Sequence, residues 1–368
     1  MRSVISRSVD RLLHTTALTS PAAVDPEVAT FHAETPVVDL VVGTPLFRAD
    51  LIRRKRHGHV DLPRLEAGGV DLVGLTIATR HPDLHGTLST PHFWSLGLSR
   101  SERAADMAIC GAFLDRIEAW VEASAGRLRR VTSRADLSTL SRPRSGVGIF
   151  VGVQGGHVLD GEPANVERLR DRGVRMLALA HVMDNALVGS NTGRRKHGLT
   201  GLGREVIAEA ERVGVAVDLA HMSPAGIADT LPLLQRPFVL SHTGFVRLSG
   251  QRSRIPGRHF TRGNRNLTDA DARAVADAGG VIGLTLSTRL LGGEDLDAVA
   301  RAVDLGLDLA GPERLALGSD MDGALRMVCD AAGLPHVTQR LLAGGLDRPT
   351  VAAFLGGNAL RVLGATMP

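Results

Sequence analysis

The chain has 368 residues, of which 43% are hydrophobic and 22% charged, proportions that are typical of a soluble globular protein and exclude a disordered or membrane-embedded one. Its 43 basic and 39 acidic residues leave a formal net charge of only +4, and nearly all the basic residues are arginines. The densest basic run, RRKRHGH at 53–59, has no aromatic residues among its charges, so it favours a solvated loop over a nucleic-acid-binding surface.

Cysteine usage and the N-terminus indicate a cytoplasmic protein. Cys110 and Cys329 are too few for a disulfide framework, and Cys110 lies in an apolar helical segment where we expect it in the core. Charged residues interrupt the first twenty positions, and no stretch approaches the roughly 18 apolar residues of a membrane span. We therefore predict an N-terminal arm or helix over 1–33 and a single domain over 34–368, with no membrane or nucleic-acid partner.

Eight short apolar runs recur along the chain with helical segments between them. They are continuous rather than alternating, as in strands covered on both faces. The predicted strands lie at 36–42, 70–78, 147–155, 174–181, 215–221, 238–243, 280–287 and 314–323. The clearest helix signals lie at 201–214, 268–280 and 294–311. This alternation predicts an α/β fold, a (β/α)8 TIM-type barrel, with a doubly wound open sheet as the alternative.

Three connections are longer than the others. The first, 79–146, contains a predicted long helix at about 99–127, and the second spans 182–201. The third, 244–266, is rich in glycine and arginine and is long enough to act as a lid over a site.

Four predicted strands end in side chains that can bind a metal or transfer a proton. These are His181, His221, His242 and Asp320, with Asp322 two positions later. One such histidine is usually structural, but three on consecutive strands converge on the mouth of a barrel, where active sites lie. Imidazole and carboxylate groups suit zinc or a similar divalent ion. Six other histidines lack this placement and are predicted to be surface or supporting residues: His57, His59, His81, His85, His92 and His157.

Six sequence blocks occur in a recognisable order: HVDLPRLEAGGV, GLTGLGREVI, VAVDLAHMS, VLSHTG, LGSDMDG and FLGGNALRVL. In these blocks, and over most of the chain from about Val37 onward, the sequence resembles the membrane (renal) dipeptidases, peptidase family M19, of the metal-dependent amidohydrolase type. The resemblance implies a (β/α)8 barrel, usually a homodimer, in which two zinc ions hydrolyse a dipeptide substrate.

The resemblance also implies a role for each strand-end residue. His221 and His242 match the two histidines that hold one zinc ion, and Asp320 matches the aspartate that binds the other and orients the attacking water. His181 matches the histidine that contacts the substrate and stabilises the tetrahedral intermediate. Arg265, in NRNLTD, matches the arginine that binds the substrate carboxylate.

The chain departs from the family pattern at the metal positions. Where the family carries Asp-Gly-His-Asn-Asp at the end of strand 1, this chain has DLVVG at 39–43, so Val41 and Gly43 replace two ligands. Gln154 replaces the bridging glutamate, and a neutral amide bridges two dications poorly. We therefore expect at most one zinc ion, bound by His221, His242, Gln154 and Asp320, and no recruitment of His57 or His59.

Two classes of function remain open. In the first, the chain is a divergent hydrolase of a dipeptide or small amide, with Asp320 as general base, His181 as electrostatic stabiliser and Arg265 as the carboxylate-binding group. In the second, it is a catalytically inactive barrel that binds a small ligand or a partner protein. A changed, non-hydrolytic reaction in the same pocket is a third possibility if no metal binds. The retained histidines and aspartates favour the enzyme.

Overall fold

The computed structural model describes residues 11–18, 22–48, 50–82, 88–89, 93–140, 146–250 and 262–368. Eight parallel strands follow one another around the sheet in chain order. They are β1 (Val38–Val42), β2 (Leu72–Ala78), β6 (Val147–Gln154), β7 (Val174–Ala178), β8 (Ala216–Asp218), β9 (Val239–Thr243), β10 (Val281–Leu284) and β11 (Leu315–Leu317). All eight predicted strands are confirmed, each somewhat shorter than predicted.

The sheet closes on itself beyond the end of β11. The Asp320 amide donates to the Val41 carbonyl at 3.0 Å, and the Gly43 amide donates to the Met321 carbonyl at 2.7 Å. These bonds join the last strand to the first and produce a nearly closed eight-stranded barrel. The (β/α)8 prediction is confirmed, and the doubly wound alternative is wrong because its sheet would keep two free edges.

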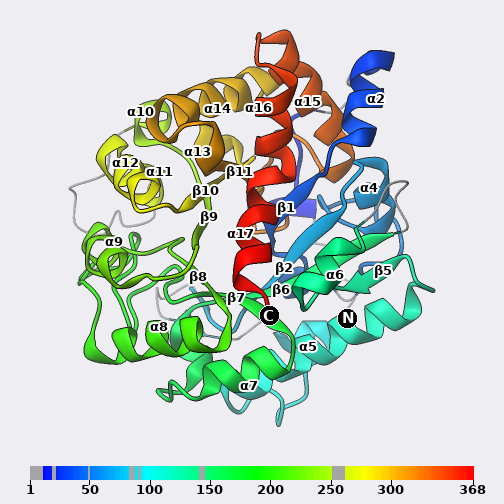
Figure 1. The fold of residues 1–368 in the computed structure, drawn as a ribbon. Helices are drawn as coiled ribbons and strands as arrows, with labels where there is room; N and C mark the ends of the chain where they lie inside the picture. Colours follow the sequence, from blue (N-terminus) through cyan, green and yellow to red (C-terminus); the bar gives the residue numbers. More distant parts are fainter. Residues whose placement is uncertain are drawn as a thin grey trace.

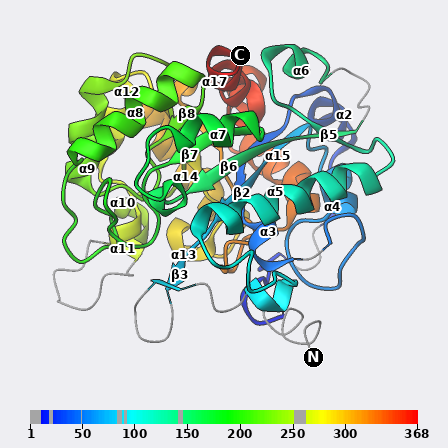
Figure 2. The ribbon, with the colours of Figure 1, turned by 90° about the horizontal axis from the view of Figure 1, so that it is seen from below.

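Side chains from all eight strands fill the interior of the barrel and pack against the C-terminal helix, α17 (Asn358–Thr366). Val362 and Leu363 of α17 are fully buried in this cluster. In Figure 1 the red α17 lies across the centre of the ring of strands, and in Figure 2 it lies at the opposite end from α3 (Thr44–Phe47) and α13 (Thr288–Leu291). The helix therefore closes the end where the strands begin, which leaves the other end available for a site.

The three outer helices with the clearest sequence signals begin and end close to where those signals predict. Helix α8 (Gly201–Val213) stops at Gly214, which adopts φ 76°, and α12 (Asp269–Asp277) begins with a capping box between Thr268 and Asp271. Helix α14 (Leu296–Ala310) is capped by the Asp295 side chain. The remaining α-helices are α2 (Pro26–Glu34), α4 (Leu62–Ala67), α5 (Asp106–Ala123), α6 (Arg134–Ser138), α7 (Asn165–Asp171), α9 (Pro224–Thr230), α10 (Val246–Ser249), α11 (Arg262–Arg265), α15 (Leu334–Ala343) and α16 (Arg348–Ala352).

The first long connection differs from its prediction. Its helix, α5, covers 106–123 rather than about 99–127, because Ser99 and Glu102 form a separate turn and Ala125 and Gly126 adopt positive φ. The connection also adds β5 (Leu128–Arg130) beside β6, and a short pair, β3 (His81–Pro82) and β4 (Leu88–Ser89). Cys110 is fully buried in α5, as predicted, and burial raises the pKa of its thiol to about 12.

The N-terminal arm runs beside the segment after β11. The Ala17 amide donates to the Met327 carbonyl, and the Met327 amide donates to the Thr15 carbonyl, both at 2.9 Å. Part of the predicted arm is therefore attached to the domain, and the domain boundary at residue 34 stays a prediction. The middle of the predicted lid, 251–261, lies outside the described residues. None of the described helices has the length and apolar character that a membrane span requires.

Candidate active site at the barrel mouth

A pocket of about 240 Å³ opens at the carboxyl ends of the barrel strands. It gathers Gln154 from the end of β6, His181 from the loop after β7, His221 from the loop after β8 and Asp320 from the segment after β11, together with Arg265 from α11. The sixth predicted residue, His242 in β9, lies directly behind His221. All six predicted site residues therefore come together.

His221, in the loop after β8, and His242, in β9, point their outer nitrogens at each other. Nε2 of His221 lies 3.1 Å from Nε2 of His242. Behind His242, the Asp218 carboxylate accepts hydrogen bonds from the amide (2.8 Å) and the hydroxyl (2.5 Å) of Ser241. Because that hydroxyl hydrogen points at Asp218, the Ser241 oxygen accepts the Nδ1 hydrogen of His242 at 2.8 Å. His242 therefore directs the Nε2 lone pair toward His221.

Arg265 brings a positive charge to this histidine pair. Its Nη2 donates to the His242 carbonyl oxygen at 3.0 Å and lies 3.3 Å from Nε2 of His221. Burial lowers the pKa of Arg265, while the Asp320 and Asp218 carboxylates raise it, and guanidinium groups stay charged in proteins. Burial, followed by this neighbouring charge, holds the pKa values of His221 and His242 well below the usual value, so both imidazoles are neutral.

Burial favours the neutral form of both Asp320 and His181. Burial raises the pKa of Asp320 to about 7, against the opposing effect of the Arg265 charge, so the carboxylate can both take and release a proton near neutral pH. Burial lowers the pKa of His181 to about 4, which keeps the ring neutral. His221 and Asp320 adopt φ 66° and 61°, a strained backbone that is common at functional sites.

The end of β1 supplies no ligand to the pocket. Val41 and Gly43 line the wall, and neither carries a donor atom on its side chain. A Cβ added at Gly43 would lie only 2.7 Å from the Asp322 carbonyl oxygen and 3.2 Å from Cα of Gly323. Backbone of the segment after β11 therefore fills the place where a side chain of residue 43 would begin.

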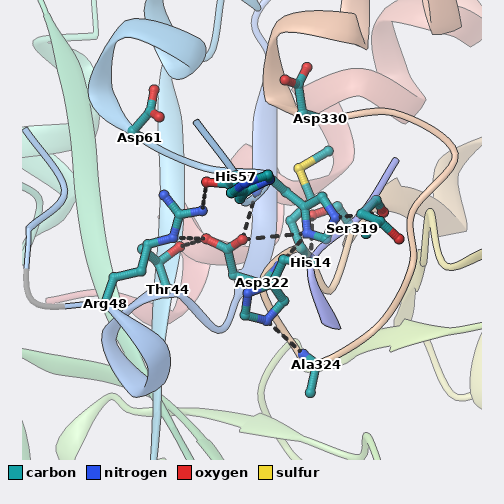
Figure 3. A network of polar contacts seen from close by, with 12 residues as sticks. His14, Thr44, Arg48, His57, Asp61, Ser319, Asp322, Ala324 and Asp330 are labelled. Carbon is teal, nitrogen blue, oxygen red and sulfur yellow. Dashed lines mark hydrogen bonds and ion pairs between the residues drawn. The ribbon is translucent and has the colours of Figure 1, made fainter. Parts of the chain in front are cut away.

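A buried polar network holds that segment against the residues that follow β1 (Figure 3). The Asp322 carboxylate pairs with Nε of Arg48 at 3.2 Å and accepts hydrogen bonds from Oγ1 of Thr44 at 3.0 Å and the His59 amide at 2.8 Å. His14, from the N-terminal arm, accepts from the Ala324 amide at 3.2 Å. Burial alone would raise the pKa of Asp322, but the Arg48 charge and the His59 hydrogen bond outweigh it and hold that pKa well below its usual range.

Gln154 is buried at the end of β6, and its Nε2 atom has no hydrogen-bond partner among the described residues. A glutamate here would place a second carboxylate in the pocket with Asp320, whereas the amide adds no charge. The glutamine therefore keeps a polar group at the pocket wall without the negative charge that a pair of metal ions would need.

The residues present do not fit a pair of zinc ions. Two ligand positions, Val41 and Gly43, have no donor atom, and Gln154 is neutral. No group of three or more His, Cys, Asp or Glu side chains within the described ranges is arranged to hold a metal ion. A single ion on His221 and His242 would have to share the pocket with the charge of Arg265. The four-residue metal-ligand set stays a prediction.

Sequence reasoning finds the pocket residues and misses their support. His59, predicted to be a surface or supporting residue, is fully buried and supports Asp322. Nothing in the sequence around Arg48 and His14 marks a contact with residues some 270 to 310 positions away. A weak signal exists for Asp322, since a second aspartate in SDMDG needs a partner when it is buried.

Comparisons with known proteins agree with this fold. A family model described as membrane dipeptidase (peptidase family M19) matches residues 26–367. The uncharacterized protein in the pqqA 5′ region of Klebsiella pneumoniae is 30% identical over 255 residues, covering 65% of this chain and 89% of that protein. Dipeptidase tcpJ of Claviceps purpurea is 27% identical over 316 residues, covering 83% of this chain and 69% of that protein.

A solved structure with the same fold carries a ligand. It is a metallo peptidase from Rhodobacter sphaeroides, liganded with a phosphinate mimic of the dipeptide L-Ala-D-Ala. The two chains superpose with a TM-score of 0.75 at 22% identity, over 90% of this chain and 99% of that one. At this identity the match establishes the fold.

Proposed function

The chain belongs to the membrane dipeptidase family (peptidase family M19), and on that premise we propose that it is a dipeptidase-like hydrolase that acts on a dipeptide or small amide in the pocket at the barrel mouth. The observation that carries the proposal is the gathering of Asp320, His181 and Arg265 around one pocket of about 240 Å³. A pocket of this volume can enclose a ligand of the size of a dipeptide or small amide.

Each of these three residues has a role in the proposed reaction. The Asp320 carboxylate takes a proton from a water molecule as the water oxygen attacks the amide carbon, and the same proton then goes to the departing amine. The neutral His181 ring donates a hydrogen bond to the oxyanion of the tetrahedral intermediate. Arg265, whose Nη2 is held by the His242 carbonyl, presents the rest of its guanidinium to the substrate carboxylate.

The zinc prediction needs a separate test. Family members are metallopeptidases, typically zinc-dependent, but the described residues do not fit two ions. The expected single ion on His221, His242, Gln154 and Asp320 therefore stays a prediction, and no step above depends on it. The homodimer and the cytoplasmic location also stay predictions.

Hydrolysis of dipeptides by purified protein tests the proposed function. A panel of dipeptides with free carboxyl termini, with the same peptides amidated as controls, is followed by amine release with and without added zinc. The proposal expects turnover of free dipeptides, slower turnover of amidated ones, and loss of activity in Asp320→Asn. No turnover of any dipeptide would contradict it.

One observation favours a second candidate, a barrel that binds a dipeptide-like ligand without hydrolysing it. The place of a ligand side chain at Gly43 is filled by backbone, so one ligand position of the family's metal site is closed. In the same assay this candidate expects saturable binding of a dipeptide, measured by calorimetry, with no amine release.

A further inference from the structure

The cation nearest to the facing histidines is part of the protein itself. Arg265 is 9% exposed, and its two Nη2 hydrogens are directed at the His242 carbonyl oxygen (3.0 Å) and at Nε2 of His221 (3.3 Å). The guanidinium is therefore anchored to the pair by its carbonyl bond and faces the imidazole nitrogen that a metal ion would use.

The positions of the ring protons on His221 and His242 determine which interactions Nε2 of His221 already makes. Since Nδ1 of His242 donates to Ser241, Nε2 of His242 holds a lone pair. If His221 is protonated on Nδ1, its Nε2 accepts from Arg265, and two lone pairs then face each other at 3.1 Å. That arrangement is repulsive unless a positive charge lies beside both nitrogens, and Arg265 supplies such a charge.

Protonation of His221 on Nε2 gives the alternative. Its hydrogen then bonds to His242, and no lone pair is left on that atom for an ion. In either tautomer a zinc ion at about 2.0–2.1 Å from Nε2 of His221 has to displace an existing interaction, because the atom has only one lone pair.

The charge in the pocket leads to the same conclusion. Asp320 is the one carboxylate among the described residues that line the pocket, and it faces the Arg265 charge. Gln154 contributes no charge, and the side chains of Val41 and Gly43 contribute no donor. The described lining holds one carboxylate against the two guanidiniums of Arg265 and Arg289, so it has no negative charge left to balance a dication.

We propose that the guanidinium of Arg265 is the resident cation of this pocket, occupying the role of a metal ion at His221 and His242, so that the protein binds no zinc there. This goes beyond the proposed hydrolysis and does not depend on it. It also gives the His221 side chain a role, because its imidazole nitrogen and the His242 carbonyl together position the arginine.

Zinc titration of the full chain tests the proposal. Protein stripped with a chelator is titrated with zinc chloride by calorimetry, and zinc per chain is measured after desalting. Wild type is expected to retain no stoichiometric zinc. Arg265→Ala frees Nε2 of His221, so its zinc affinity should rise at least about tenfold, and Arg265→Ala/His242→Ala should lose that gain. Arg273→Ala, which removes an exposed arginine of α12 that does not line the pocket, is the control and should behave as wild type.

Two results would overturn the proposal: wild type that keeps one zinc ion per chain and loses it in His242→Ala, or an Arg265→Ala variant with unchanged zinc affinity. If Arg265→Ala does not fold, Arg265→Gln retains the size of the side chain without its charge, and the same gain is expected. Zinc-free protein that hydrolyses no dipeptide would contradict the proposed function alone, whereas active protein with zinc on His221 and His242 would contradict this inference alone.

Discussion

On two sides of the barrel mouth, a buried aspartate accepts the same pair of hydrogen bonds from a serine, but only one of the two sides carries the facing pair of histidines. Between β8 and β9, Asp218 accepts from the Ser241 amide at 2.8 Å and from its hydroxyl at 2.5 Å. Between β1 and β11, Asp39 accepts from the amide and hydroxyl of Ser319 at the same two distances. Each aspartate also accepts from the amide two residues further on, at 2.9 Å for Asp218 and 3.3 Å for Asp39.

The two aspartates support different residues at the mouth. Asp218 precedes His221 and lies behind His242, so its side of the mouth presents two imidazoles. Asp39 precedes Val41 and Gly43, and the segment carrying Asp322 lies over them. The supporting bonds are present on both sides, although the ligands are absent from one. A supporting network in a barrel is therefore weak evidence that the site beside it binds a metal.

The largest expected effect is on catalysis. Asp320→Asn removes the proposed general base between the two sides and should lower kcat/KM for dipeptides by about 10²- to 10⁴-fold. Asp304→Asn, which changes an exposed aspartate on α14, is the control and should have no effect. Steady-state kinetics on both purified variants measure this, and an Asp320→Asn enzyme within tenfold of wild type would contradict the assigned role.

Removing the negative charge of Asp322, which holds the segment after β11 in place beside β1, should cause the largest loss of stability. Asp322→Asn leaves Arg48 buried without its partner, so the free energy of unfolding should fall by about 3–5 kcal/mol at pH 7, measured by urea denaturation.

The pH dependence of this effect has a definite sign. The folded pKa of Asp322 lies below its unfolded value, so its contribution is present above about pH 4 and is lost as the pH falls toward the folded pKa. The difference between wild type and Asp322→Asn should therefore shrink in acid. A difference that stays constant from pH 7 to pH 3 would show that charge is not the cause.

Adding a side chain at Gly43, one of the two positions without a ligand, should lower the free energy of unfolding by less. Gly43→Ala forces its Cβ against the Asp322 carbonyl and should destabilise the fold by about 1–3 kcal/mol. Gly201→Ala, at a helix position with open space around it, should stay within about 0.5 kcal/mol of wild type. Thermal unfolding compares the two, and equal stabilities would mean that the segment after β11 can move away from Gly43.

The smallest expected effect is the difference in stability between alanine variants of the two serines, Ser241 and Ser319. Ser241→Ala and Ser319→Ala each remove one hydroxyl bond to a buried aspartate and should each cost about 1–2 kcal/mol. Ser241→Ala also leaves Nδ1 of His242 without its acceptor, so it should be the more destabilising by about 0.5–1 kcal/mol. Denaturant unfolding resolves this difference. A larger loss of stability in Ser319→Ala would contradict the stabilising role given to the bond between Ser241 and Nδ1 of His242.

The framework is predictable from the sequence because its signals are local. Continuous apolar runs locate all eight strands, and the positions of His181, His221, His242 and Asp320 at the strand ends place them at one mouth. Capping residues such as Asp295 and the glycine stop at Gly214 also predict helix ends correctly.

The rest depends on contacts between distant parts of the chain. The network around Asp322 joins residues from the N-terminal arm, β1 and its following loop to the segment after β11, and no spacing rule relates them. The contact of Arg265 with His221 is unpredictable for the same reason, since it depends on how α11 packs over the strand ends. The absence of ligands at Val41 and Gly43 is visible in the sequence, whereas the closure of their space is not.

Anomalous diffraction at the zinc edge from Gln154→Glu crystals grown with zinc shows directly whether this pocket can hold two zinc ions. This variant regains the one carboxylate that a bridging position needs, while the end of β1 still offers no donor and no room for one. We expect no pair of ions in the pocket. Two neighbouring zinc peaks at full occupancy, one of them beside Gly43, would contradict it.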